Sequence, residues 1–280
     1  METGQKIIQP SNNIDHSSPN ILSIQVSLNG LSFCILNSHT KTITYHKTEG
    51  LEKKHTPQEL QEKLEALLES DSRLQQPFSA VNLIYDNELF TLVPQPLFEE
   101  DHLADYLKFN SRILQTDFIS YDTIESIETN IVYVPYVNIN NFLYDRFGEF
   151  VYKHFSTILI EKVISNYASL DGPSMYINVN ESHFEIIVLD KKQLILFNSF
   201  DYATKEDFIY YILFTAEQLK LNPEEFTIHL FGRVNEGDEL FNITYKYVRH
   251  VQLVELEKPY KIALGFEIGL KNNFVLQHSF

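Results

Sequence analysis

Apolar and polar residues begin to alternate regularly after residue 18. The alternation runs through residues 21–47 and is interrupted at Leu28-Asn29-Gly30 and again at residues 38–41. A period of two residues is typical of strands with one buried face, and Asn-Gly is a frequent hairpin turn. The pattern therefore predicts a three-stranded meander, preceded by a flexible tail over residues 1–18, which are rich in Ser, Asn and Pro.

A helix is predicted after the meander. Thr56 can cap its first turn, Pro57 suits the first helical position, and Glu59 can complete a capping box. The leucines that follow form one apolar stripe: Leu60, Leu64, Leu67 and Leu68. The apolar segment over residues 80–85 then predicts a further strand.

The second half of the chain repeats this order of elements. Residues 174–200 predict three strands, a helix follows that Thr204 and Asp207 can cap, and residues 226–232 predict another strand. Few residues are identical between the halves, so chance alternation is the alternative explanation. The common order nevertheless favours an internal duplication, with a first unit over residues 19–172 and a second over residues 173–280.

The segment between the repeated parts has no counterpart in the second half. Residues 90–110 predict a strand and then a helix, and residues 128–150 predict a strand, Pro135 and another helix. Residues 152–172 fit a strand or a helix equally well. The turn Asp171-Gly172-Pro173 marks the end of the first unit.

Three meandering strands, a helix and then alternating strands and helices resemble the ribonuclease H-like unit. Two such units in one chain resemble the actin-like ATPase superfamily, and the layout is also similar to its pilus-assembly and secretion members. Three segments are more specific: LVPQPLFEEDHLADYLKFN, MYINVNESHFEIIVLD and NSFDYATKEDFIYYILF. From Ile21 to the C-terminus the chain resembles domain-of-unknown-function family 3822, bacterial proteins mainly from the Bacteroidetes. The resemblance implies an α/β, actin-like ATPase fold of two ribonuclease H-like units, each with a mixed five-stranded sheet flanked by helices.

The resemblance also implies where a nucleotide would bind. In this superfamily the phosphates lie against one hairpin turn from each unit, usually Asp-x-Gly with Gly, Ser or Thr nearby. The first turn here holds Asn29 and Gly30 without an Asp, and the second holds Glu181 and Ser182 without a Gly. Only Gly232 represents the Gly pair that contacts adenosine. We therefore expect degenerate turns and no cofactor, or vestigial ATP binding through Asn29, Gly30, Ser182 and Gly232.

Charge and composition narrow the possible partners. The 280 residues hold 22 Lys and Arg against 38 Asp and Glu, a net charge of −16. Nucleic acids and anionic membranes need many basic contacts, so neither is an expected partner. No apolar run reaches the ~18 residues of a membrane span, and the first residues lack an apolar signal core, which predicts a cytoplasmic protein. A single Cys34, in an apolar run, excludes an internal disulfide or a cysteine-based metal cluster.

No catalytic or metal-binding motif stands out. The ten histidines include no HExxH arrangement, and the chain has no G-x-S-x-G elbow, Walker loop or G-x-G-x-x-G. The acidic run Glu99-Glu100-Asp101 precedes an apolar-periodic stretch and fits the negative start of a helix better than a catalytic pair. We therefore assign no catalytic and no metal residue.

These observations favour a non-catalytic, degenerate ATPase that acts by binding a protein partner, and the acidic charge favours a basic one. The alternatives are a divergent ATP-binding ATPase or kinase of the same superfamily, and a subunit of a homo-oligomer. In the segment over residues 198–214, the helix core does not need the polar ends of Asn198, Tyr202 and Tyr210. We expect these three residues on the partner surface.

Overall fold

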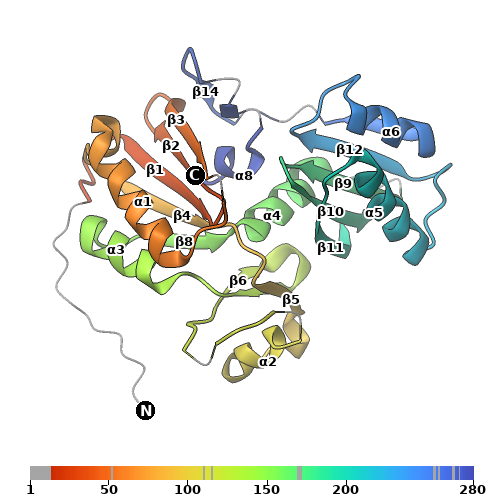
Figure 1. Cartoon of the computed structure of the whole chain (residues 1–280), viewed down its shortest axis with the longest axis horizontal. Helices are drawn as coiled ribbons and strands as arrows, with labels where there is room; N and C mark the ends of the chain where they lie inside the picture. The colour runs from red at the N-terminus through yellow and green to blue at the C-terminus, as the bar shows by residue number, and fades with distance from the viewer. Residues whose placement is uncertain are drawn as a thin grey trace.

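The computed structural model describes residues 14–51, 53–109, 111–114, 116–168, 172–254, 257, 259–266, 269–270 and 272–280. Two larger sheets lie on opposite sides of a central helix, and a small third sheet lies beside them (Figure 1). Most of the expected tail, residues 1–13, falls outside the described residues. Within the described part of the chain, no helix is long and apolar enough to cross a membrane.

The first sheet has the strand order β14-β3-β2-β1-β4-β8. Its strands are β1 (Asn20–Ser27), β2 (Gly30–Asn37), β3 (Thr42–Gly50), β4 (Ala80–Tyr85), β8 (Val151–His154) and β14 (Lys261–Ile262). β1 pairs antiparallel with β2 and parallel with β4, so the sheet is mixed. The predicted meander is confirmed. So is the helix α1 (Pro57–Ser70), in which the Thr56 and Glu59 side chains form a capping box.

The second sheet has the strand order β11-β10-β9-β12-β13. Its strands are β9 (Pro173–Val179), β10 (His183–Asp190), β11 (Gln193–Asp201), β12 (Thr227–Gly232) and β13 (His250–Leu253). Two helices that contact each other, α5 (Lys205–Gln218) and α6 (Glu239–Tyr247), connect its last strands. Thr204 and Asp207 form the predicted capping box of α5. Both large sheets thus contain an antiparallel meander followed by two parallel strands, the topology expected of ribonuclease H-like units.

The segment without a counterpart, which lies inside the first unit, builds the third sheet. Its strands are β5 (Phe90–Pro94), β6 (Ser120–Ile124) and β7 (Thr129–Tyr133), with β7 in the middle. The helix α2 (Leu103–Leu107) accompanies it, together with the short 3₁₀ helices η2 (Gln95–Leu97), η3 (Glu100–His102) and η4 (Glu125–Ile127). The helix α3 (Val137–Phe147) and the 3₁₀ helix η1 (Ser72–Leu74) instead contact α1 of the first unit. The stretch that fitted a strand or a helix contains both, because β8 leads directly into the helix α4 (Phe155–Tyr167).

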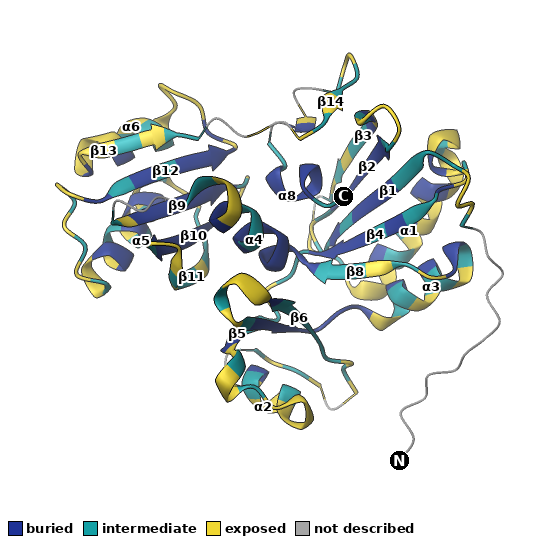
Figure 2. Ribbon diagram, turned by 180° about the vertical axis from the view of Figure 1, so that it is seen from behind, coloured by how far each residue is buried: buried dark blue, intermediate teal, exposed yellow. Residues whose placement is uncertain are grey.

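The two large sheets share a buried apolar layer. α4 and the short helix α8 (Phe274–Gln277) lie between them and are mostly buried (Figure 2). The ring of Phe231, at the end of β12, lies 5.1 Å from the ring of Phe274 in α8. The C-terminal residues also bind the first sheet directly, since Asn82 donates a hydrogen bond to the carbonyl of Ser279 at 2.8 Å. The last residues of the chain therefore hold the two sheets together.

β14 is a sixth strand of the first sheet that the sequence did not reveal, because two residues have no detectable periodicity. The unit boundaries at residues 18 and 172, and the duplication itself, stay predictions.

Candidate functional site: the cleft between the units

A cleft of about 770 Å³ lies where the two units and the third sheet meet. Residues 27–29, at the turn between β1 and β2, line one part of it. Residues 86–92, which run from the end of β4 into β5, line a second part. The third part comes from the β9–β10 turn together with β10 and β11 of the second sheet. This volume is within the range of known ligand sites, roughly 300–1,000 Å³.

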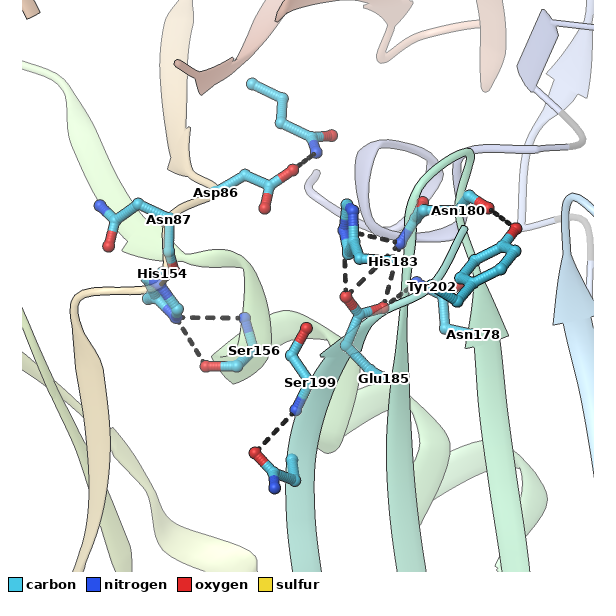
Figure 3. Close-up of polar contacts among 12 residues, drawn as sticks. Asp86, Asn87, His154, Ser156, Asn178, Asn180, His183, Glu185, Ser199 and Tyr202 are labelled. Carbon is cyan, nitrogen blue, oxygen red and sulfur yellow. Dashed lines mark hydrogen bonds and ion pairs between the residues drawn. The ribbon is translucent and has the colours of Figure 1, made fainter. Parts of the chain in front are cut away.

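A buried carboxylate lies beneath the turn between β9 and β10 (Figure 3). Glu185 on β10 is completely buried and accepts hydrogen bonds from the side-chain amides of Asn178 at 2.7 Å and Asn180 at 3.1 Å. Its second oxygen lies 3.3 Å from Nε2 of His183. Burial lowers the pKa of His183, but the hydrogen bond and charge of Glu185, together with the charges of Asp86 and Asp201, outweigh it and raise the pKa to about 9. His183 is therefore cationic at neutral pH.

Asp86 follows β4 and faces the same space from the first unit. It accepts a hydrogen bond from Nε2 of Gln25 at 2.8 Å. Burial raises the pKa of Asp86, and the nearby charge of Glu185 raises it further, while the cation of His183 and the hydrogen bond from Gln25 oppose the shift. Asp86 and His183 thus influence each other electrostatically across the two units.

The cleft as a whole is acidic. Its charged lining residues are Lys54, Asp86, Glu88, His183, Glu185 and Asp201. Four of these groups form two ion pairs: Lys54 contacts Glu88 at 3.2 Å, and His183 contacts Glu185. Asp86 and Asp201 are the carboxylates outside these two pairs, so the cleft carries a net charge of −2 when His183 is protonated and all four carboxylates are ionised.

A buried histidine supports the wall of the cleft. His154 is completely buried at the start of α4, where Nε2 donates to the carbonyl of Asn87 at 3.1 Å and Nδ1 accepts from the Ser156 hydroxyl at 2.6 Å. Burial lowers the pKa of His154 to about 3, although the bond to Asn87 opposes the shift. His154 and Ser156 are both shielded from solvent, so this pair does not form an accessible base and nucleophile. It instead fixes the position of Asn87, which lines the cleft.

The structure separates the four residues that the resemblance implied for nucleotide binding. Asn29 and Ser182, one from each unit, line the same cleft, whereas Gly30 and Gly232 do not belong to its described lining. Gly232 has φ +87°, and a Cβ atom there would lie 2.4 Å from the carbonyl oxygen of Val179. Gly232 therefore permits the close approach of β12 and β9. Whether any of the four contacts a nucleotide stays a prediction.

The three expected partner residues lie in different surroundings. Asn198 on β11 lines the cleft. The Tyr202 hydroxyl donates to the carbonyl of Asn180 at 2.8 Å. Tyr210 on α5 is 60% exposed and stacks on Phe214, with ring centroids 6.0 Å apart. Of the three, only Asn198 belongs to the cleft, and their role in binding stays a prediction.

Most residues of the cleft were not singled out from the sequence, and the most consequential of these are Asp86, Glu185 and Tyr136. A signal was present for Glu185, since it is the one charged residue inside the apolar run FEIIVL of a strand with both faces buried. Asp86 and Tyr136 each follow a buried strand, but neither has a spacing that marks a site. Among the described residues, no group of three or more His, Cys, Asp or Glu side chains is arranged to hold a metal ion.

Comparisons with known proteins agree with this architecture. The model of the family described as protein of unknown function (DUF3822) matches residues 9–251. A solved protein of Bacteroides thetaiotaomicron, with an actin-like ATPase fold and unknown function, is 25% identical with a TM-score of 0.74. That similarity covers 94% of this chain and 95% of the Bacteroides chain.

A chain of the PilM–PilN type IV pilus biogenesis complex is 9% identical with a TM-score of 0.57, covering 92% of this chain and 96% of that chain. At this identity the likeness shows the fold alone. No curated protein matches the chain. The expected fold and family are confirmed: the chain belongs to the DUF3822 family of proteins of unknown function and has an actin-like ATPase fold.

Proposed function

We propose that this protein is a non-catalytic member of the actin-like fold that works by binding another protein. The observation that carries the proposal is the buried Glu185 carboxylate beneath the β9–β10 turn. In the superfamily this turn faces the nucleotide phosphates. Here the side chains of Asn178, Asn180 and His183 are directed to Glu185, so their donor groups are already engaged within the protein.

The negative charge of the cleft also opposes the binding of a nucleotide. One negative charge on a carboxylate and one on a phosphate, about 6 Å apart, repel each other by roughly 3 kcal/mol at an effective dielectric constant of about 20. One uncompensated carboxylate at that distance would therefore weaken phosphate binding by roughly 100-fold. The cleft has two carboxylates outside its ion pairs, Asp86 and Asp201, and its cations Lys54 and His183 are already paired.

The same charge favours a basic partner. Complementary charge raises the rate at which partners meet and disfavours partners of like charge. The net charge of −16 extends this preference to the whole surface. The PilM–PilN neighbour, a complex of two proteins, supports the use of this fold in protein binding. The cytoplasmic location and a homo-oligomeric state stay predictions.

A second candidate is a divergent ATP-binding ATPase or kinase. It is favoured by the position of Asn29 and Ser182, which line one cleft from opposite units. The first turn, however, offers no carboxylate to orient a magnesium ion, because Asn29 stands where the superfamily has Asp.

Calorimetric titration with Mg·ATP and with Mg·ADP separates the two candidates, and a phosphate-release assay accompanies it. We expect no saturable heat at nucleotide concentrations up to about 1 mM, where a Kd of 1 mM corresponds to about −4.1 kcal/mol, and no turnover. Micromolar binding with turnover, lost on Ser182→Ala, would overturn the proposal. Light scattering over a range of protein concentrations tests the homo-oligomer in the same samples.

A further inference from the structure

Two strand edges border the cleft without a partner strand. β11 pairs with β10 only, and β5 pairs with β7 only, so each forms the edge of its sheet among the described strands. The Phe90 ring on β5 and the Phe197 ring on β11 are 5.8 Å apart. The two edges therefore approach each other at one end of the cleft, although no ladder joins them.

The backbone of β11 faces the cleft. Phe197, Asn198 and Ser199 are consecutive, and all three line the cleft. Because successive side chains of a strand point to opposite faces, a cavity lined by consecutive residues follows the edge of the strand. Phe90, Thr91 and Leu92 line the cleft in the same consecutive way on β5.

Hydrogen bonds show which backbone groups of β11 point outward. The Ser199 N–H donates to the side-chain oxygen of Asn198 at 3.0 Å, away from β10 (Figure 3). The Tyr202 N–H instead donates to the carbonyl of Ser182 at 2.9 Å, on the side of β10. Since backbone groups alternate along an antiparallel strand, Phe197, Ser199 and Asp201 direct their N–H and C=O groups toward the cleft.

A buried polar group provides an independent sign of a missing ligand. Tyr136 lines the cleft and is 6% exposed. Its hydroxyl has no hydrogen-bond partner of normal geometry within the described chain, although the side chain of Asn87 is close enough to oppose the rise in the pKa of Tyr136 that burial causes. A buried hydroxyl without a partner is unfavourable, and a ligand in the cleft could supply the missing bond.

We propose that the cleft binds an extended, basic segment of a partner protein, which adds as a strand to the free edge of β11. The segment pairs with the outward backbone groups of Phe197, Ser199 and Asp201, a stretch of about five residues. Its alternate basic side chains face Asp86 and Asp201. This inference rests on the proposed protein-binding function and specifies the kind of partner.

Asn198 has a distinct role in this arrangement. Its side-chain oxygen accepts a hydrogen bond from the Ser199 N–H, so this outward donor of the strand edge is already satisfied. Open edges promote unwanted pairing, and natural proteins protect them. An incoming strand must displace Asn198, so the side chain competes with the partner.

Fluorescence anisotropy with a labelled peptide tests the inference. The probe is the nonapeptide Lys-Val-Lys-Thr-Lys-Val-Lys-Thr-Lys, and two control peptides accompany it. One has N-methyl groups on its five central amides, which keeps the charge but removes strand pairing. The other has Glu in place of every Lys. We expect micromolar binding of the probe, at least about tenfold weaker binding of the methylated peptide, and no saturable binding of the acidic one.

Three variants locate the site on the protein. Ser199→Pro removes an outward N–H and is compatible with an edge strand, so binding should weaken about tenfold or more. Ser199→Ala keeps the N–H and serves as the matched control, with unchanged affinity. Asn198→Ala uncovers the donor and should tighten binding about two- to fivefold. Thermal unfolding and circular dichroism confirm that each variant is folded.

The outcomes separate the two proposals. Equal binding of the probe and its methylated form, or full affinity in the folded Ser199→Pro variant, overturns strand addition. If the protein binds neither the peptide nor Mg·ATP, this inference is overturned and the proposed function still stands. Dimerisation that Ser199→Pro abolishes would show that a second copy of this chain occupies the edge, and would also overturn the inference. Nucleotide turnover overturns the proposed function instead.

Discussion

The carboxylate of Glu185, which is completely buried, lies 3.3 Å from Nε2 of His183 beneath the β9–β10 turn. The two residues belong to one strand, β10, and point to the same face. Asn178 and Asn180 complete the set of hydrogen bonds to the carboxylate. Buried ion pairs contribute little net stability, but removing one partner leaves an unfavourable buried group. The β9–β10 turn therefore depends on both charges.

Glu185→Gln should destabilise the protein by roughly 3 kcal/mol, because it removes the buried member of a hydrogen-bonded ion pair whose other member, His183, is partly exposed. The pKa of His183 should also fall, since the opposing effect of burial would then dominate. Urea unfolding measures the first effect and NMR titration of the histidine ring the second. Glu181→Gln is the matched control, because Glu181 forms an exposed pair with Arg233 that should contribute less than about 1 kcal/mol. An unchanged pKa of His183 in Glu185→Gln would contradict the pairing.

The raised pKa of His183 predicts a loss of stability at alkaline pH. The folded protein keeps the proton up to about pH 9, while an unfolded histidine loses it near pH 6.5. The contribution is therefore fully present below pH 6.5 and disappears between about pH 6.5 and 9. The slope should reach at most about 1.4 kcal/mol per pH unit. Urea unfolding across this range measures it, and His183→Gln should flatten the curve; a curve as steep as that of the wild type would assign the slope to another group.

His154 should make the stability of the protein depend on pH in the opposite sense from His183. Burial holds its pKa at about 3, so the folded protein keeps this ring neutral while an unfolded histidine gains a proton below pH 6.5. Stability should therefore fall as the pH drops from about 6.5 toward 3. His46, whose pKa burial lowers to about 4, adds to the same effect. The ring resonances of His154 should not titrate above pH 4 in the folded protein; titration near pH 6 would refute the neutral, buried state.

Two glycines with the same backbone conformation should respond differently to alanine. Gly232 has φ +87° and Gly237 has φ +88°. A Cβ atom at Gly232 would lie 2.4 Å from the carbonyl oxygen of Val179, whereas nothing lies within 4 Å at Gly237. Gly237→Ala should cost about 1 kcal/mol for the left-handed backbone alone, and Gly232→Ala about 3 kcal/mol or more. Equal losses of unfolding free energy in the two variants, measured by chemical denaturation, would show that the contact with Val179 adds no destabilisation.

Local patterns predicted most individual elements correctly. The two capping boxes, Thr56 with Glu59 and Thr204 with Asp207, formed as expected because each joins residues three positions apart. The stretch around residues 152–172 was ambiguous because a four-residue strand and a long apolar helix are continuous there. α4 is buried on most sides between the sheets, so its apolar residues follow no clean helical stripe.

The candidate site was predicted only in part. Asn29, Ser182 and Asn198 were singled out from turns and from a strand end, and all three line the cleft. Gly232 lies outside the lining of the cleft, and the absence of a side chain there permits its close contact with Val179. Glu181, which the sequence places in the second turn, forms an exposed pair with Arg233, and the buried charge beneath that turn comes from Glu185.

By itself, the sequence determined the two meanders, their capped helices, the acidic character of the surface and the family. These depend on composition and on residues a few positions apart. Only the tertiary structure decided that Asp86, His183 and the open edge of β11 border one cleft. These groups are about 100 residues apart in the chain, and α4 and α8 bring them together by packing between the two sheets. Such proximity depends on long-range burial, for which no local spacing of residues is a signal.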